Sequence, residues 1–194
     1  MSKSPALFAV LAACLAVTAP AWAATLAGAP EPVKTVDIQR LQGRWYEIAR
    51  IPNRFEKDCG FATTDWVPQS GGRFLVTQTC KKTEVDRDGH VTRATADPLD
   101  PAGNAKWRMN YFGGLIRRDY WLVDHAADGS WVLMGMPRRP SLWLFGRQQS
   151  LTPVQREQAL QRARALGYDP ALLVFPSSLP GEYIGPPPVE RAER

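Results

Sequence analysis

The residues of this chain with the widest chemical repertoire are its three cysteines and two histidines. Two histidines, His90 and His125, are too few to hold a metal ion without further ligands, so we expect no metal site. The sequence has no Gly-x-Ser-x-Gly segment that would mark a nucleophilic serine and no glycine-rich phosphate-binding loop. Neither histidine has a serine or cysteine recognisably placed beside it. We therefore predict no catalytic residue and no cofactor.

A tryptophan and a distant arginine have a different use. Residues 43–51 read Gly-Arg-Trp-Tyr-Glu-Ile-Ala-Arg-Ile, and a later run, Leu-Trp-Leu-Phe-Gly-Arg, ends at Arg147. Both stretches are typical of β-strands. In a closed barrel, Arg147 would cover Trp45 at the floor, and a cation over an indole contributes about 0.5–2 kcal/mol. A barrel sealed in this way is suited to holding a small apolar molecule.

The N-terminus has the features of a secretory signal peptide, predicted at 1–23. Lys3 is its only charge, an apolar run covers 6–17, and Ala21-Trp22-Ala23 is a small-x-small cleavage site. The alternative is a lipobox, Leu-Ala-Ala-Cys, that ends at Cys14. Acylation at Cys14 would anchor the protein to a membrane, whereas simple secretion would leave it free.

Removal of Cys14 leaves Cys59 and Cys80. In an oxidising compartment two cysteines favour one disulfide, and two unpaired buried thiols are the alternative. The formal net charge of +5 is spread along the chain without a long basic run. We therefore expect no nucleic-acid partner.

Turn-forming residues recur at short spacing, with β-branched and aromatic residues between them, which is typical of an all-β domain. Strands are predicted at 43–51, 60–67, 73–81, 90–96, 105–112, 119–125, 130–136 and 141–148. Eight strands in simple succession favour an antiparallel up-and-down β-barrel, whose interior is wide enough for one small ligand.

A helix follows the strands, with Thr152 as N-cap and Gly167 at its end. The last strand is apolar on both faces, so we expect the helix to pack on the outside of the barrel over Leu142 and Leu144. A short strand is predicted at 172–175, and a flexible proline-rich tail at 177–194.

These residues resemble a lipocalin. The resemblance rests on Gly43-x-Trp45, eight sequential strands, an arginine that ends the eighth and the helix after it. The run 43–50 with Phe55-Glu56, and the run 142–147, are similar to the bacterial outer-membrane lipocalins and the apolipoprotein D group. The resemblance covers 34–176. It implies a barrel whose base is Gly43, Trp45 and Arg147.

Alternation along the strands predicts which side chains line the barrel once Trp45 is set inward. The predicted ligand-binding residues are Glu47, Ala49, Ala62, Thr64, Trp66, Phe74, Val76, Trp107, Met109, Tyr111, Trp121, Val123, Trp143 and Phe145. The strand at 130–136 cannot be phased. The alternative is an ordinary packed core, but the small Ala49 and Ala62 favour a hollow. Glu47 needs a partner, and Arg108, Arg147 or a polar head group of the ligand are candidates.

Because the strand that begins near Trp45 starts at the closed end, alternate loops gather at the open end, which we call the mouth. The mouth loops are predicted at 52–59, 82–88, 113–118 and 137–140, with Cys59 and Cys80 beside them. Basic residues predominate there: Arg54, Lys57, Lys81, Lys82, Arg87, Arg117, Arg118, Arg138 and Arg139. The hypothesis is an electropositive rim that attracts anionic head groups or a phospholipid surface. Ordinary solvated loops are the alternative.

The resemblance implies that the protein is no enzyme but stores or carries lysophospholipids, fatty acids or similar lipids. It also implies a place in the bacterial periplasm or on the periplasmic face of the outer membrane, with a role in envelope maintenance. The alternatives are a barrel enzyme, such as an isomerase, and a pigment or tetrapyrrole binder, which the many tryptophans suggest. Both a monomer and a homodimer stay open.

Overall fold

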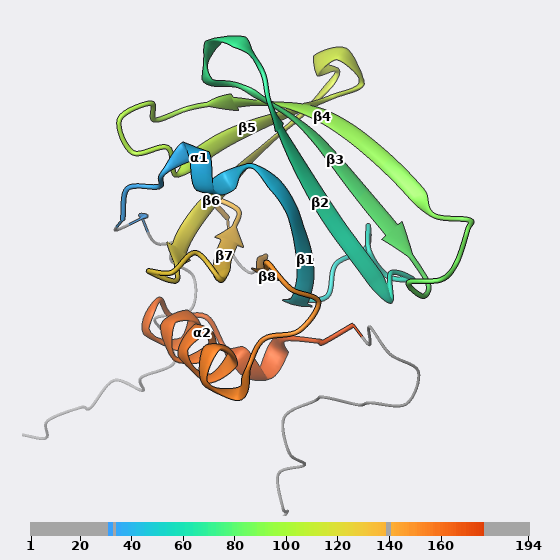
Figure 1. The fold of residues 1–194 in the computed structure, drawn as a ribbon, viewed down its shortest axis with the longest axis vertical. Helices are drawn as coiled ribbons and strands as arrows, with labels where there is room; N and C mark the ends of the chain where they lie inside the picture. The colour runs from blue at the N-terminus through green and yellow to red at the C-terminus, as the bar shows by residue number, and fades with distance from the viewer. Residues whose placement is uncertain (1–30, 33, 139–140, 177–194) are drawn as a thin grey trace, which may run out of the picture.

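In a computed structural model, which describes residues 31–32, 34–138 and 141–176, eight antiparallel strands close into a barrel in sequence order. The strands are β1 (Gly43–Arg50), β2 (Phe61–Pro68), β3 (Phe74–Lys81), β4 (His90–Pro98), β5 (Lys106–Tyr111), β6 (Ile116–His125), β7 (Trp131–Gly135) and β8 (Leu142–Gly146). Helix α1 (Ile38–Leu41) precedes them and α2 (Pro153–Ala165) follows them. The predicted all-β barrel is therefore confirmed (Figure 1).

Some predictions fall on other parts of the chain. The predicted signal peptide at 1–23, the lipobox at Cys14 and the tail at 177–194 lie outside the described residues. Among the described residues, no helix combines the length and apolar character that a membrane crossing requires.

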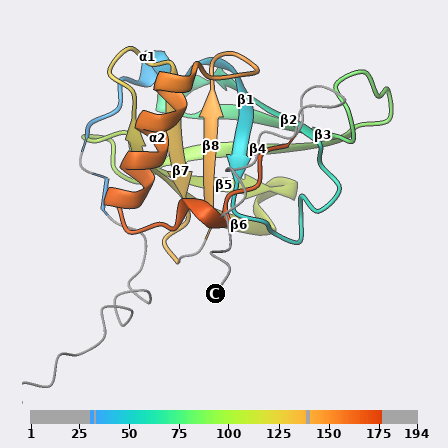
Figure 2. The same ribbon diagram turned by 90° about the horizontal axis from the view of Figure 1, so that it is seen from below.

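Helix α2 packs on the outside of the barrel, across β7 and β8 (Figure 2). Its buried Ala159 and Ala163 share an apolar cluster with Leu142 and Leu144, the outward side chains of β8. Small alanine side chains let the helix approach the sheet closely. Thr152 caps the helix, since its hydroxyl accepts a hydrogen bond from the Gln155 amide at 3.2 Å. The predicted external helix and its contact face are confirmed.

A buried carboxylate adds a polar contact between α2 and the barrel. Asp124 on β6 accepts hydrogen bonds from Arg162 of α2 and forms an ion pair with Lys34 at 2.5 Å. Burial raises the pKa of Asp124, but the hydrogen bonds from Lys34 and Arg162 outweigh it and hold that pKa below its ordinary value. The paired aspartate therefore links the helix and the N-terminal segment to one strand.

The base of the barrel is closed by the predicted arginine. The Arg147 guanidinium lies 3.6 Å from the Trp45 ring centroid, and Nη1 donates to the carbonyl oxygens of Gln42 and Arg44 at 2.9 and 3.0 Å. The Trp45 indole nitrogen donates to the Leu41 carbonyl oxygen of α1 at 3.0 Å. Gly43 has a φ of +85° and passes close to this guanidinium, so a side chain there would be strained.

Two β-bulges change which face several residues occupy. The β1–β8 register shifts between Glu47 and Ala49, so Ala49 pairs with Leu144 on the outer face instead of lining the barrel. The β6–β7 register shifts between Leu122 and Asp124, so Asp124 faces α2 outside the barrel together with Val123. The predicted inward positions of Ala49 and Val123 are both wrong: for Ala49 because alternation fails where a residue is inserted, and for Val123 because β6 has the opposite phase, with Tyr120 and Leu122 inward.

Trp121 is also outside the barrel, contrary to the prediction. It pairs with Lys106, whose ammonium lies 4.4 Å from the indole centroid, and it packs against the cluster under α2. Its neighbours Tyr120 and Leu122 point inward instead. The outward tryptophan is stable because the lysine stem and the helix side of the barrel cover it.

Two predicted boundaries also change. Strand β6 begins at Ile116, since the 3-10 turn η3 (Phe112–Gly114) reverses the chain within a few residues. Arg117 and Arg118 therefore belong to a strand and not to a loop. In place of the strand at 172–175, the 3-10 turn η4 (Pro170–Leu172) is followed by a single bridge from Val174 to Arg50.

The predicted disulfide is present at the mouth. Cys59 enters β2 and Cys80 leaves β3, with Cα atoms 5.3 Å apart. The bridge fastens the end of the loop between β1 and β2 to the neighbouring hairpin.

Replacement of Arg147 by methionine should lower the free energy of unfolding by about 2–3 kcal/mol. The variant loses the cation over Trp45 and leaves carbonyl groups without their donor. Urea titration followed by tryptophan fluorescence measures the change. Arg93→Met, at an exposed position on β4, is the matched control and should change stability by less than about 0.5 kcal/mol. Equal losses in both variants would contradict the assigned role of Arg147.

The bridge between Cys59 and Cys80 can be tested by thiol titration and by its effect on stability. Unreduced protein that begins near Ala24 should show no reactive thiol after denaturation, and both thiols should appear after reduction. Replacing both cysteines by alanine should destabilise the fold by about 3 kcal/mol, as expected for a loop of this length. Thiol titration and urea unfolding measure the two outcomes. Reactive thiols in the unreduced chain would refute the bridge.

Candidate ligand-binding cavity

The mouth half of the barrel encloses a cavity of about 390 Å³. The predicted lining residues that border it are Glu47, Ala62, Thr64, Trp66, Met109, Tyr111, Trp143 and Phe145. Most of the wall is apolar, with threonine hydroxyls and a few charged groups between the rings. A hollow of this size and composition is suited to a small, mainly apolar ligand.

The base half of the barrel is filled by side chains. Phe74, Val76 and Trp107 point inward as predicted, but they are buried below the cavity and do not border it. The rings of Trp66, Phe74 and Trp107 pack edge to face with centroids 5.4–5.8 Å apart, and Trp66 borders the cavity above them. Alternation predicts the face of a strand but not the depth at which the hollow begins.

Several lining residues were not predicted, among them Tyr120, Met134, residues of β4 and the loop between β1 and β2. Tyr120 faces the cavity because β6 has the opposite phase to the one expected. Its cross-strand partner Trp107, which points inward, is the signal that could have found it. Met134 lines the wall beside its cross-strand partner Trp143, and this pairing shows which face of β7 points inward. From the loop between β1 and β2, Phe55 reaches the cavity.

The partner of Glu47 is Arg50, not Arg108 or Arg147 as suggested from the sequence. The Arg50 guanidinium donates to Glu47 at 2.5 Å, and both side chains are almost wholly buried. The bulge after Glu47 makes this possible, because it returns Arg50 to the inner face opposite Trp143. Arg50 also donates to the carbonyl oxygens of Glu56 and Cys59 at 2.6 and 2.9 Å.

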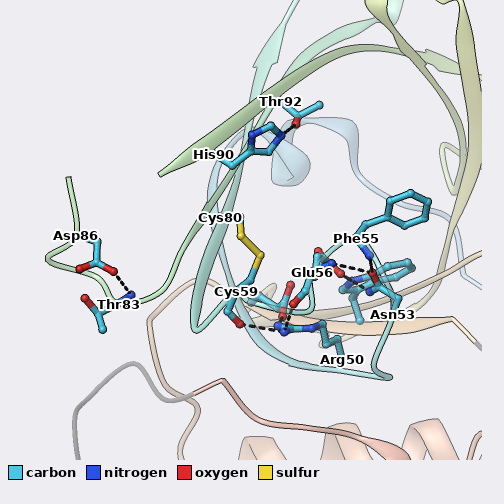
Figure 3. Close-up of a disulfide and its surroundings, with 12 residues drawn as sticks. Arg50, Asn53, Phe55, Glu56, Cys59, Cys80, Thr83, Asp86, His90 and Thr92 are labelled. Carbon is cyan, nitrogen blue, oxygen red and sulfur yellow. Dashed lines mark hydrogen bonds and ion pairs between the residues drawn. A yellow bond between two sulfur atoms is a disulfide. The ribbon is translucent and has the colours of Figure 1, made fainter. Parts of the chain in front are cut away.

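The loop between β1 and β2 folds inward beside the disulfide (Figure 3). Asn53 accepts hydrogen bonds from the amides of Phe55 and Glu56 at 3.0 and 3.1 Å. The Glu56 carboxylate then accepts a hydrogen bond from the Trp143 indole nitrogen at 2.9 Å. These contacts place a second carboxylate at the mouth of the cavity, close to Glu47.

The two carboxylates affect the groups around them. Burial, together with the charge of Glu56, raises the pKa of Glu47 to about 7, although Arg50 opposes the shift. Burial raises the pKa of Tyr111 and of Tyr120 on the opposite wall, and the charge of Glu56 adds to both shifts. Glu47 and Glu56 therefore form an acidic group inside the cavity, below the basic loops of the mouth.

The described residues contain no cluster of histidine, cysteine, aspartate and glutamate that could hold a metal ion. His90 borders the cavity, where its ring hydrogen-bonds the Thr92 hydroxyl at 3.0 Å. His125 lies outside, with its ring nitrogens near the carbonyl oxygens of Ala126 and Thr35. Cys59 and Cys80 form the disulfide.

Comparisons with known proteins agree with this geometry. The profile of the lipocalin-like domain matches residues 36–178. The temperature-induced lipocalin-1 of Arabidopsis thaliana is 28% identical over 148 residues, which cover 72% of this chain and 77% of that protein. The outer membrane lipoprotein Blc of Citrobacter freundii is 27% identical over 173 residues, which cover 86% of this chain and 96% of that protein.

A solved structure shares the fold at low sequence identity. Insecticyanin from the tobacco hornworm Manduca sexta superposes with a TM-score of 0.62 at 14% identity, over 78% of this chain and 87% of that chain. The barrel, the arginine over the tryptophan, the external helix and the family profile all agree. The chain belongs to the lipocalin-like family, whose members bind small hydrophobic ligands.

Proposed function

We propose that this protein binds small amphiphilic lipids, of the lysophospholipid or fatty-acid class, in the barrel cavity and stores or carries them. The observation that carries the proposal is the half-filled barrel. A wall that includes Trp66, Met109 and Phe145 borders the hollow, and the charged Glu47 and Glu56 lie on the side formed by β1 and the loop after it. An acyl chain can lie along the apolar wall while its head group stays at the mouth.

The proposal extends to the place of action. The relative from Citrobacter freundii is named an outer membrane lipoprotein, and the N-terminal sequence of this chain reads as an export signal. We propose a bacterial carrier in the periplasm or at the periplasmic face of the outer membrane, with a role in envelope maintenance.

Extraction of lipid from protein purified without additives would identify its ligand by mass spectrometry. A visible absorption band would instead favour a bound pigment.

The mouth supports a membrane partner. Large apolar side chains protrude from its loops, among them Phe55, Val85, Phe112 and Leu115, each at least 70% exposed. Arg54, Lys57, Arg117 and Arg138 stand among them, whereas Arg139 lies outside the described residues. Apolar tips on loops in which basic residues outnumber acidic ones match the interface of an anionic bilayer, although Glu84 and Asp86 flank Val85. We propose that the mouth faces such a surface while the lipid enters.

Filling the cavity should abolish ligand binding. Ala62→Phe places a ring in the hollow, and we expect affinity for a nitroxide-labelled lysophospholipid to fall at least about tenfold, since the chain loses apolar contact area. Quenching of tryptophan fluorescence measures binding, with Trp66 and Trp143 bordering the cavity. Val67→Phe, at a half-exposed position on the same strand, is the control and should bind normally. Full binding by Ala62→Phe would exclude the cavity as the site.

Charge reversal at the mouth should weaken membrane binding. Arg117→Glu with Arg138→Glu should reduce co-sedimentation with phosphatidylglycerol vesicles at least about tenfold, because each basic residue near an anionic surface contributes about 1 kcal/mol. Added salt should reduce wild-type binding as well. The control is Arg73→Glu with Arg93→Glu, since Arg73 borders the turn at the opposite end. An equal reduction by the control would show a net-charge effect and would count against a docking mouth.

A further inference from the structure

We infer that the cavity selects amphiphiles whose polar end is a protonated amine, because Glu47 and Glu56 face the hollow together while the buried Arg50 supplies one positive charge for both. The inference rests on the proposed function and narrows its ligand class. It concerns the inner polar group of Glu47, Arg50 and Glu56, which lies below the basic rim of the mouth and has the opposite sign.

This group contains two carboxyl groups and one guanidinium. The Arg50 guanidinium is committed to Glu47 and to two backbone carbonyl groups, those of Glu56 and Cys59. The Glu56 carboxylate accepts from neutral donors, the amide of Asn53 and the indole of Trp143. When both carboxyl groups are ionised, this group of two carboxylates and one guanidinium carries one excess negative charge, and Glu56, which is partly buried, has no cation of its own. A partly buried charge of this kind attracts either a proton, which raises the pKa of Glu47, or a cation.

The charge of Glu56 acts on residues of three strands around the cavity. Glu56 raises the pKa of Glu47 on β1, of Tyr111 on β5 and of Tyr120 on β6, in each case in addition to burial. Because these residues lie on different walls of the cavity, the charge of Glu56 acts across it, and Arg118 at the rim opposes it at Tyr120. A ligand that passes between these walls therefore meets the charge of Glu56.

Aromatic side chains line the cavity beside the two carboxylates. The rings of Tyr120 and Trp143 lie 5.7 Å apart, and the indole of Trp143 points its N–H at Glu56. Phe145 is paired with Glu47 across β1 and β8 and borders the same hollow. An ammonium held by carboxylates next to aromatic faces gains from both interactions. A ligand carboxylate in the same place would be repelled.

Arg118 and His90 are the other lining residues, among those that the structure describes, that can carry a positive charge. Arg118 borders the cavity but is exposed at the rim, where water screens it. His90 borders the cavity on β4. The cavity-facing residues of β2 and β8 carry no charge. The excess negative charge therefore belongs to the pair of Glu47 and Glu56.

The test compares three ligands with the same alkyl chain: dodecylamine, dodecanol and dodecanoate, each below its micelle concentration. Calorimetry on the mature protein at about pH 8 should give the amine an affinity at least about tenfold above that of the carboxylate, with the alcohol between them. Above a pKa of about 7, Glu47 loses its proton, so the cation finds a full charge. The amine should therefore bind about tenfold more tightly at about pH 8 than at about pH 6.

Two variants test the residues. Glu56→Gln keeps an oxygen that accepts from Trp143 and should reduce the preference for the amine at least about fivefold without loss of dodecanol binding. Glu47→Gln should have the same effect and should also remove the pH dependence. Glu84→Gln, on the exposed loop between β3 and β4, changes the net charge equally and should leave the preference intact. His90→Gln should leave the pH dependence intact.

The outcomes separate the two proposals. Binding of all three ligands with equal affinity, or tightest binding of dodecanoate, would overturn the inference while the lipid-binding function stands. Failure of all three to bind would overturn both. An amine preference that survives in both Glu47→Gln and Glu56→Gln would show that other groups create it, and it would overturn the assignment to this pair.

Discussion

The contact between Arg147 and Trp45 is the constraint on which the rest of this structure depends. The guanidinium sits on the outer side of the indole and binds the carbonyl groups of the chain that crosses the base, while the opposite side of the indole faces the core. One end of the barrel is thereby closed to water. Because the closed end also packs Trp66, Phe74 and Trp107 against one another, an empty space can exist only toward the other end.

The two bulges decide which side chains of β1 and β6 point into the barrel and which point toward α2. The bulge in β1 turns Ala49 outward and the bulge in β6 turns Asp124 outward, where strict alternation would place both inside, and both residues then contribute to the contact with α2. The bulge in β1 also returns Arg50 to the interior, where Glu47 needs a cation. A local irregularity of the backbone thus supplies both the helix contact and the charge pairing of the cavity.

The mouth combines opposite properties at two depths. The loops carry basic and apolar side chains outward, while Glu47 and Glu56 create a negative region just inside. The disulfide and the hydrogen bonds of Asn53 and Arg50 hold the loop between β1 and β2 in place, so that Glu56 points inward. The outer zone is suited to recruitment at an anionic surface, and the inner zone to discrimination among the lipids that enter.

The sequence by itself determined the succession of eight strands, the pairing of Trp45 with Arg147, the disulfide, the external helix and most of the inward faces. The strands, the helix and most inward faces follow from short-range rules, namely alternation, turn chemistry and capping, whereas the contact of Trp45 with Arg147 followed from the resemblance and the disulfide from two cysteines in an exported chain. Only the tertiary structure decided the positions of Ala49, Trp121 and Val123, the partner of Glu47 and the depth of the cavity. Those depend on register between strands that are distant in sequence and on how far large rings fill a closed space, and neither is encoded in the periodicity of a single strand.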